Sequence, residues 1–220
     1  MKPDTAVVDV DGTLVDTNYH HALAWVRALA RSDLYPPVWR VHRAIGMGGD
    51  RLVAEIAGNQ AERDHGDAVR EAWAEEYDPL LREVRVLAGA RELLGYLREH
   101  RVTVVLATSG KPEHVSHYLD LLGGREVAAQ VVTAEDADAS KPAPDLVSAA
   151  LDRVDASSAV MVGDSVWDVR AAAAVDVPTV CVRSGGFSVD ELRDAGAATV
   201  VDDLPAVQRH WAAELQGRRS

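Results

Sequence analysis

The sequence predicts an α/β fold: a doubly wound, Rossmann-like parallel sheet of about five strands with an inserted α-helical cap domain. The first observation is a set of short, valine-rich runs without polar alternation, typical of strands buried on both faces of a parallel sheet. The second is the alternation of these runs with helix-like stretches. The third is a segment of roughly eighty residues after the first strand that shows only helical patterns.

Five strands are expected, each too short for a helix and bounded by turn or polar residues. They are Thr5–Val10, Val102–Ala107, Val127–Thr133, Ala159–Val162 and Pro178–Val182. Helical patterns follow the later strands, at Val115–Leu122, Asp145–Val154, Val166–Val175 and Val189–Ala195. This order favours parallel strands joined by helical crossovers.

The long first connection is best explained as an inserted helical domain, because a structureless loop of that length is rare in a compact protein. Amphipathic helices are expected at Tyr19–Ala30, Pro37–Ile45, Arg51–Ala57 and Ala61–Leu81. Proline and glycine pairs separate the first three of them. We therefore expect a cap domain over residues 16–86 and a catalytic core over residues 1–15 and 87–220.

Composition narrows the class of partner. The chain has 220 residues and a formal net charge of −12, which argues against binding to nucleic acid or to an anionic membrane. No apolar run is long enough to span a bilayer, and the N-terminus lacks a signal-peptide pattern. Cys181 is the only cysteine, which fits a reducing compartment. We expect a cytoplasmic monomer or homodimer whose ligand is a small molecule.

Polar side chains end or follow four of the expected strands, at the carboxyl ends where open α/β sheets bind their ligands. These side chains are Asp9, Asp11, Thr108, Ser109, Lys141, Asp164 and Asp168. Any one aspartate alone would be read as a turn or helix-cap residue. Their occurrence at successive strand ends makes coincidence a poor explanation, and predicts that they share one site.

The charges of this cluster predict a bound cation. Four aspartates face the single positive charge of Lys141, an arrangement that is unfavourable unless a cation joins it. Ligands that are all oxygen favour a hard ion, and a few carboxylates together with a substrate phosphate favour Mg²⁺. The sequence therefore predicts Mg²⁺ as cofactor and a phosphorylated metabolite as partner.

The segment Asp9-Val10-Asp11-Gly12-Thr13-Leu14-Val15-Asp16 resembles the first motif of the haloacid dehalogenase superfamily. The pairs Thr108-Ser109 and Lys141-Pro142, and the segment from Gly163-Asp164 to Asp168, resemble its other three motifs in order and spacing. The inserted helices resemble the cap of the phosphoglycolate phosphatase and β-phosphoglucomutase branch. Asp11 distinguishes the chain from the dehalogenases of this superfamily, which lack the second aspartate, and favours phosphoryl chemistry.

The resemblance implies a role for each motif position. Asp9 would be the nucleophile and a metal ligand, and Asp11 would be the acid and base and would bind the metal through its backbone carbonyl. Asp164 and Asp168 would complete the metal site. The phosphate-binding residues would be Gly12, Thr108, Ser109, Gly110 and Lys141.

The function that follows is a magnesium-dependent phosphatase acting on small phosphomonoesters through an aspartyl-phosphate intermediate. Phosphoglycolate, a sugar phosphate or a nucleoside monophosphate would suit it as substrate. The alternative is a phosphomutase of the β-phosphoglucomutase type, which would need a phosphorylated priming compound. The four motifs recognise only the phosphoryl group and the metal, so they do not choose the leaving group.

Substrate specificity would then depend on the cap. The loop Gly46-Met47-Gly48-Gly49 is read either as a turn between helices or as a loop that contacts the leaving group. The residues expected to contact the leaving group are His20, His21, Arg43, Gly46, Asp50 and Arg51. Trp25, Trp39 and Trp73 are expected in the core of the cap, and Lys111 is expected to be solvated at the start of a helix.

Overall fold

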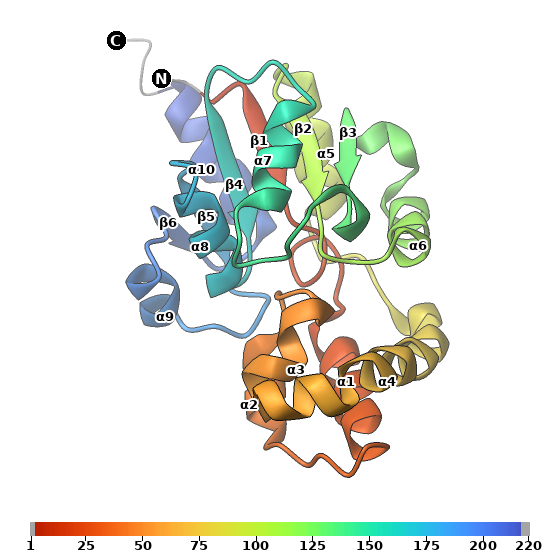
Figure 1. Cartoon of the computed structure of the whole chain (residues 1–220). Coiled ribbons are helices and arrows are strands. Elements are labelled where there is room, and N and C mark those ends of the chain that lie inside the picture. The colour runs from red at the N-terminus through yellow and green to blue at the C-terminus, as the bar shows by residue number, and fades with distance from the viewer. Residues whose placement is uncertain (1–2, 217–220) are drawn as a thin grey trace.

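The computed structural model describes residues 3–216 and contains one six-stranded parallel sheet, in the order β3-β2-β1-β4-β5-β6 (Figure 1). The strands are β1 (Thr5–Val8), β2 (Thr103–Ala107), β3 (Gln130–Val132), β4 (Ala159–Gly163), β5 (Thr179–Val182) and β6 (Thr199–Val201). The predicted α/β class with a helical insertion is confirmed. The central strand β1 pairs with both β2 and β4, so its carboxyl end lies at the middle of the sheet edge.

The sheet has one strand more than the five expected. The additional strand, β6, is only three residues long, and each of its residues is half-buried. It pairs with β5 at the edge of the sheet, with Val180 opposite Thr199. A run this short and this exposed lacks the apolar signature of a buried strand, which explains why the sequence did not reveal it.

Helices cover both faces of the sheet (Figure 1). They are α5 (Ala90–Glu99), α6 (Pro112–Leu122), α7 (Asp145–Asp152), α8 (Val166–Ala173), α9 (Val189–Asp194) and α10 (Leu204–Gln216), with short 3₁₀ turns at Arg125–Val127 and Ala134–Asp136. Alternate side chains of β1 enter different clusters: Val8 packs in the cluster that contains Leu93, whereas Val7 packs in the cluster that contains Leu146. The sheet therefore has a core on each side, as a doubly wound fold requires.

The inserted helices lie between β1 and β2 in the sequence and gather at one end of the sheet (Figure 1). They are α1 (Asn18–Ala30), α2 (Val38–Ala44), α3 (Gly49–Ala57) and α4 (Asn59–Tyr77), followed by the 3₁₀ helix η1 (Asp78–Glu83). They enclose a hydrophobic cluster of their own, which contains Leu29, Leu52 and Val69. Burial in that cluster, rather than helix propensity alone, stabilises these helices.

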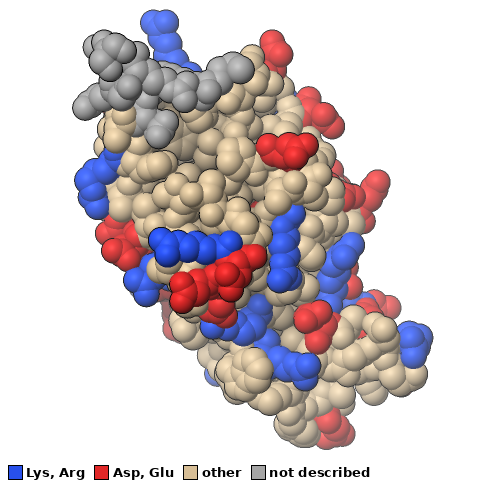
Figure 2. Space-filling model, turned by 90° about the vertical axis from the view of Figure 1, so that its left-hand side faces the viewer, with Lys and Arg blue, Asp and Glu red and all other residues tan. Residues whose placement is uncertain are grey.

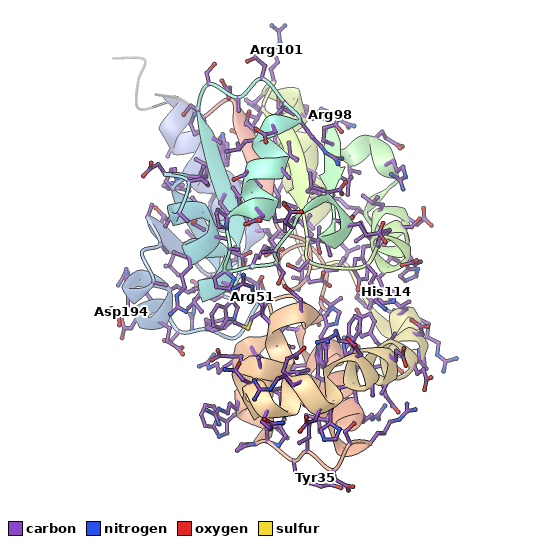
Figure 3. All side chains as sticks on the ribbon, viewed as in Figure 1. Tyr35, Arg51, Arg98, Arg101, His114 and Asp194 are labelled. Atoms are coloured by element: carbon purple, nitrogen blue, oxygen red, sulfur yellow. The ribbon has the colours of Figure 1, made fainter. Side chains whose placement is uncertain are left out.

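Two of the three tryptophans expected in the core of the inserted helices are there. Trp25 and Trp73 are buried, and their rings stack with centroids 5.2 Å apart. The prediction for Trp39 was wrong: it lies on α2 and is 67% exposed. Figure 3 shows Tyr35, near the start of α2, at the end of the inserted helices that points away from the sheet.

A histidine connects the inserted helices to the core. His114 of α6 lies at the junction of the two parts (Figure 3), and its Nε2 is 3.0 Å from Oδ1 of Asp78 at the start of η1. The ring of Tyr77 lies beside this histidine, with centroids 5.0 Å apart, and the hydroxyl oxygens of Tyr77 and Tyr118 are 2.5 Å apart. These contacts link the last turn of α4 and η1 to the helix that follows β2.

On the face that Figure 2 shows, basic side chains lie beside acidic ones, and neither sign of charge dominates. Ion pairs of the structure include Arg43 with Glu191, 2.9 Å apart, and Arg183 with Asp202, 3.0 Å apart. Among the described residues, no helix is long and apolar enough to cross a membrane.

Candidate active site

The expected site residues gather at the carboxyl edge of the sheet. Asp9 follows β1, Thr108 follows β2 and Asp164 follows β4, each directly after the last strand residue. The backbone of Asp9 is held in place because its N–H donates to the carbonyl of Val162, 2.9 Å away. Parallel strands end at the same edge, so residues far apart in sequence meet there.

Lys141 is the central cation of the site and is almost fully buried. Its Nζ donates to Oδ1 of Asp9 at 2.5 Å and to Oδ1 of Asp168 at 2.6 Å. Burial alone would lower the pKa of Lys141, but Asp168 and Asp9 together raise it above its ordinary value. The ammonium group therefore remains charged between the two carboxylates.

Three buried carboxylates, from Asp9, Asp164 and Asp168, offer ligand atoms that lie within 4.8 Å of one another. Burial raises the pKa of Asp9 well above its ordinary value; Lys141 opposes this rise, and the neighbouring aspartates add to it. Burial and the charge of Asp168 raise the pKa of Asp164 to about 7. Acids with raised pKa values packed this closely form a site that a cation would stabilise.

The carboxylate of Asp164 is fixed from both sides. Thr13 donates its hydroxyl to Oδ1 at 2.9 Å, and Asn18, the first residue of α1, donates its amide to Oδ2 at 2.8 Å. Gly12 has a positive φ of 77°, and a Cβ there would lie 2.5 Å from Oδ2 of Asp164. Only glycine allows the backbone this close to the carboxylate.

Asp168 lies in the first turn of α8, where it forms a capping box with Ser165. Its Oδ2 accepts from the Ser165 hydroxyl at 2.6 Å and from the Ser165 backbone N–H at 3.1 Å, while its Oδ1 accepts from Lys141. Both oxygens of Asp168 therefore have protein donors, which fix the rotamer of the side chain.

Asp11 accepts hydrogen bonds from two parts of the molecule. Thr17 and Thr108 each donate a hydroxyl to it at 2.9 Å, and Nε2 of His21 is 2.9 Å from its Oδ1. Burial raises the pKa of Asp11, but the charge and hydrogen bond of His21 lower it, and so do the hydrogen bonds of Thr17 and Thr108. The resulting pKa of Asp11 is about 2. Since Thr17 and His21 belong to the start of α1, the inserted helices contact this carboxylate directly.

The loop after β2 presents Thr108, Ser109 and Gly110. Thr108 is fully buried, and its Oγ1 accepts from the N–H of Gly110 at 2.9 Å. The buried hydroxyl of Ser109 has no hydrogen-bond partner among residues 3–216. An unsatisfied buried hydroxyl is costly, so it marks a place where a bound polar ligand would complete the bonding.

A cavity of about 330 Å³ lies between these residues and the inserted helices. Its lining includes all the core positions expected in catalysis, namely Asp9, Asp11, Thr108 and Lys141, and also Ser109 and Gly110. Gly12, Asp164 and Asp168 do not line the cavity. The cluster of Asp9, Asp164 and Asp168 therefore adjoins the cavity through Asp9.

The residues expected from the inserted helices divide into two groups. His21, Gly46 and Asp50 line the cavity. His20, Arg43 and Arg51 do not.

Arg43 turns away from the cavity, because its guanidinium donates to the carbonyl of Gly186 at 3.0 Å and pairs with Glu191. Arg51 lies beside Asp50, with 3.8 Å between its Nε and Oδ2 of Asp50. Neither arginine lines the cavity in this structure.

Several lining residues escaped the sequence-based prediction of the site, among them Trp25, Arg70, Trp73 and Lys111. The tryptophans gave only an apolar signal and were assigned to the core. Arg70 lies on α4, where nothing in the local sequence distinguishes it from other charged residues of that helix. Lys111 is exposed, as expected, but it also lines the cavity, and its Nζ lies 5.6 Å from the centre of the Trp73 ring.

Comparison with known proteins finds a matching family model and similar phosphatases. The family model described as haloacid dehalogenase-like hydrolase matches residues 3–176. A phosphoglycolate phosphatase from Rhodospirillum rubrum is 34% identical over 218 residues, covering 93% of this chain and 89% of that protein. The validoxylamine A 7'-phosphate phosphatase from Streptomyces hygroscopicus is 27% identical, covering 76% of this chain and 79% of that protein.

A solved structure shows the same arrangement over the whole chain. The crystal structure of a hydrolase from Pseudomonas syringae superposes with a TM-score of 0.89 at 31% identity, covering 98% of this chain and 99% of that one. The chain therefore belongs to the haloacid dehalogenase-like hydrolase family. Within it, the protein is a phosphatase of the phosphoglycolate phosphatase and β-phosphoglucomutase-like subfamily with a helical cap.

Proposed function

We propose that the protein is a magnesium-dependent phosphatase of small phosphomonoesters and that Asp9 forms an aspartyl-phosphate intermediate. One observation carries this proposal. Asp9 is buried at the end of the cavity, Lys141 holds one of its oxygens at 2.5 Å, and it shares the acidic cluster with Asp164. A fixed carboxylate between a cation and a metal site has the surroundings of a nucleophile for phosphoryl transfer.

The donor set of the cluster suits Mg²⁺, which prefers carboxylate oxygens together with substrate phosphate. Asp9 and Asp164 would hold the ion, because each still has acceptor capacity on its carboxylate. Asp168 would act through Lys141, since three protein donors, one of them the Lys141 ammonium, already bind its oxygens, whereas Asp164 accepts from two neutral donors. When bound, the ion supplies neutralisation of the phosphoryl oxygens and Lewis-acid polarisation.

In the first step, a carboxylate oxygen of Asp9 forms a bond to phosphorus while the bond from phosphorus to the leaving oxygen breaks. Lys141 stabilises the charge on Asp9 and on the phosphoryl oxygens. In the second step, water attacks phosphorus and the bond to Asp9 breaks. Phosphate leaves, and the carboxylate of Asp9 is restored.

Asp11 would move the protons of both steps. It gives a proton to the leaving oxygen in the first step and takes one from water in the second. With a pKa of about 2 it is ionised in the free protein, so it must gain a proton as the substrate binds. The negative charge of an incoming phosphate favours that proton uptake, while His21 and Thr17 keep the carboxylate oriented.

The loop after β2 would bind the phosphoryl group. Thr108 already spans Asp11 and the N–H of Gly110, so its hydroxyl lies between the acid and the loop. The unpartnered hydroxyl of Ser109 would donate to a phosphoryl oxygen. Neutral donors fixed in advance stabilise the charge that spreads over the equatorial oxygens in the transition state.

The relatives do not decide the leaving group. One relative is a phosphoglycolate phosphatase and another is a validoxylamine A 7'-phosphate phosphatase, at 34% and 27% identity. Phosphoglycolate is therefore one candidate among several small phosphomonoesters. The mutase alternative differs in its requirement for a phosphorylated priming compound.

A phosphate-release assay with Mg²⁺ across a panel of phosphorylated metabolites tests the proposal. We expect at least one compound to release inorganic phosphate in repeated turnovers without any priming compound. Conversion of one sugar phosphate into another without phosphate release would support the mutase instead. If no compound yields phosphate or a phosphorylated product, the proposed function is wrong.

A further inference from the structure

The cavity is larger than a two-carbon leaving group needs. Its volume of about 330 Å³ lies within the range of roughly 300–1,000 Å³ that is typical of pockets for drug-sized ligands. Under the proposed mechanism, the phosphoryl group would occupy only the end beside Asp9 and Ser109. The remaining space is bounded by the inserted helices and by the loop from Ala134 to Lys141.

The wall contributed by the inserted helices contains a group of aromatic and aliphatic side chains. Trp25, Trp73, Ile45 and Met47 all line it. The indole N–H of Trp73 is buried and has no acceptor among the described residues, and the residue as a whole is only 8% exposed. Apolar surface with a spare donor suits a ring that presents carbon-bound hydrogens on its faces and oxygens at its edge.

An anionic leaving group would need a free cation on this wall, and the basic side chains that the inserted helices contribute to it already have acidic partners. His21 lies 2.9 Å from Asp11. Among the described residues, Arg70 is the only arginine in the lining, and its guanidinium lies 2.8 Å from Glu62 and 2.8 Å from Asp67. It also donates to the carbonyl of Gly49 at 3.2 Å. Its charge is therefore already balanced by two carboxylates.

Carboxylates also border the cavity. Asp50 and Asp138 are both in the lining. Asp50 hydrogen-bonds to Ser140 across the junction between α3 and the core. Carboxylates are strong acceptors for hydroxyl groups but repel a second negative charge.

On the core side, Lys111 is a cation in the lining whose ammonium group forms no ion pair or hydrogen bond within residues 3–216. It is the one feature that favours an anionic leaving group. Its position over the ring of Trp73 already gives it a cation–π partner. The aromatic wall, the balanced Arg70 and the two acidic residues oppose its effect.

We infer that the leaving group is a neutral cyclic polyol, so that the substrate is a sugar phosphate or a cyclitol phosphate rather than phosphoglycolate. The inference rests on the proposed phosphatase function and specifies its substrate class. In this arrangement the ring packs against Trp25 and Trp73, and its hydroxyls donate to Asp50 and Asp138.

The test compares kcat/KM with Mg²⁺ for hexose, pentose and inositol monophosphates and for 2-phosphoglycolate. Acetyl phosphate, which has no ring, is assayed in parallel and reports whether the phosphatase chemistry itself is present. We expect at least one cyclic substrate to exceed phosphoglycolate by ~10-fold or more. If acetyl phosphate and all other compounds are inert, the proposed function fails; if phosphoglycolate is turned over best, only the substrate class fails.

Three variants sharpen this comparison. Asp50→Asn should lower the ratio of kcat/KM for the cyclic substrate to that for phosphoglycolate by about tenfold, because it weakens a hydroxyl–carboxylate bond and removes a repelling charge. Trp73→Phe, which keeps the packing but removes the N–H, should lower the same ratio. Trp39→Phe, on the exposed face of α2, is the control and should leave it unchanged.

Lys111→Met addresses the opposite assignment. We expect this variant to retain the preference for the cyclic substrate. A wild-type protein that prefers phosphoglycolate, and loses that preference in Lys111→Met, would overturn the inference and assign Lys111 to a substrate carboxylate. Circular dichroism and the melting temperature of each variant verify that it is folded.

Discussion

The edge of the sheet and the inserted helices border the same cavity, but they are built differently. At the sheet edge, Asp9, Asp164 and Asp168 are buried, and each carboxylate is held by hydrogen bonds. On the helical side, the wall consists mainly of packed side chains such as Trp25 and Met47. The hydrogen bonds at the sheet edge hold the proposed reacting groups in place. The packed side chains of the helical wall determine the shape of the cavity, and this shape can change without altering the chemistry.

The two regions meet at the first turn of α1. Thr17 and His21 contact Asp11, and Asn18 contacts Asp164, so three residues of one turn bind two carboxylates of the core. A movement of the inserted helices would therefore disturb both Asp11, the proposed acid, and Asp164, a carboxylate of the acidic cluster. Such coupling is what a lid needs if closure is to complete the catalytic arrangement.

Metal removal tests the sheet edge alone and should have the largest effect on activity. Chelation should reduce phosphate release to background, since the buried carboxylates would then repel the substrate dianion. Readdition of Mg²⁺ should restore activity, whereas Ca²⁺ should inhibit because its larger, flexible shell does not keep octahedral geometry. Full activity after exhaustive chelation would contradict the metal site.

Asp11→Asn should separate the two chemical steps. Loss of the acid and base should cost ~10²–10⁴ in kcat for an alkyl phosphate. With nitrophenyl phosphate, whose leaving group needs little protonation, the first step should be spared and the phosphoenzyme should accumulate. Rapid-quench kinetics with both substrates measure this, and an equal loss of both steps with both substrates would argue against the role of Asp11.

Asn18→Ala tests the link between the two regions. It removes the donor that holds Oδ2 of Asp164, so the apparent Mg²⁺ affinity should fall by about tenfold, the lower end expected for loss of an outer-shell partner of a metal ligand. Calorimetric titration of Mg²⁺ without substrate measures the affinity apart from activity. Arg27→Ala, on the exposed side of α1, is the matched control and should bind Mg²⁺ as the wild type does.

The smallest effect should be on the pH dependence of stability. The pKa of Asp164 is raised to about 7 in the metal-free fold, above its unfolded value of 3.8, so its contribution is fully present below 3.8 and is lost as the pH rises through 7. The pKa of Asp11, lowered to about 2, changes stability only at more acidic pH. Mg²⁺ should therefore raise the melting temperature more at pH 8 than at pH 5; an equal rise at both would contradict this account.

Much of the sheet edge could be predicted because its signals are local. A polar residue at the end of a valine-rich strand must lie at the carboxyl edge, and this rule placed Asp9, Asp164 and Thr108 from the sequence alone, although β1 ends at Val8 rather than at the expected Val10. The short strand β6 could not be predicted in the same way, since its three residues lack a buried pattern. Strand pairing with β5, a contact of the folded chain, defines it.

The helical wall was harder to predict because it depends on how helices rotate and pack. Arg43 and Arg70 are both arginines on inserted helices, and Arg43 is closer to the glycine-rich loop in sequence. Yet Arg43 turns toward Gly186, while Arg70 reaches the cavity. A sequence pattern indicates which face of a helix is apolar, but not which of its polar residues will border a cavity formed with another part of the chain.

The most direct test of the account is the site of phosphorylation in rapidly quenched enzyme. Wild-type protein mixed with Mg²⁺ and its substrate, quenched in acid and digested, should carry phosphate on the peptide that contains Asp9. Asp9→Asn should carry none and should lose at least ~10⁴-fold in turnover, as expected when a nucleophile is removed. Phosphate found instead on a serine or histidine, or an Asp9→Asn enzyme that turns over at the wild-type rate, would contradict the central claim.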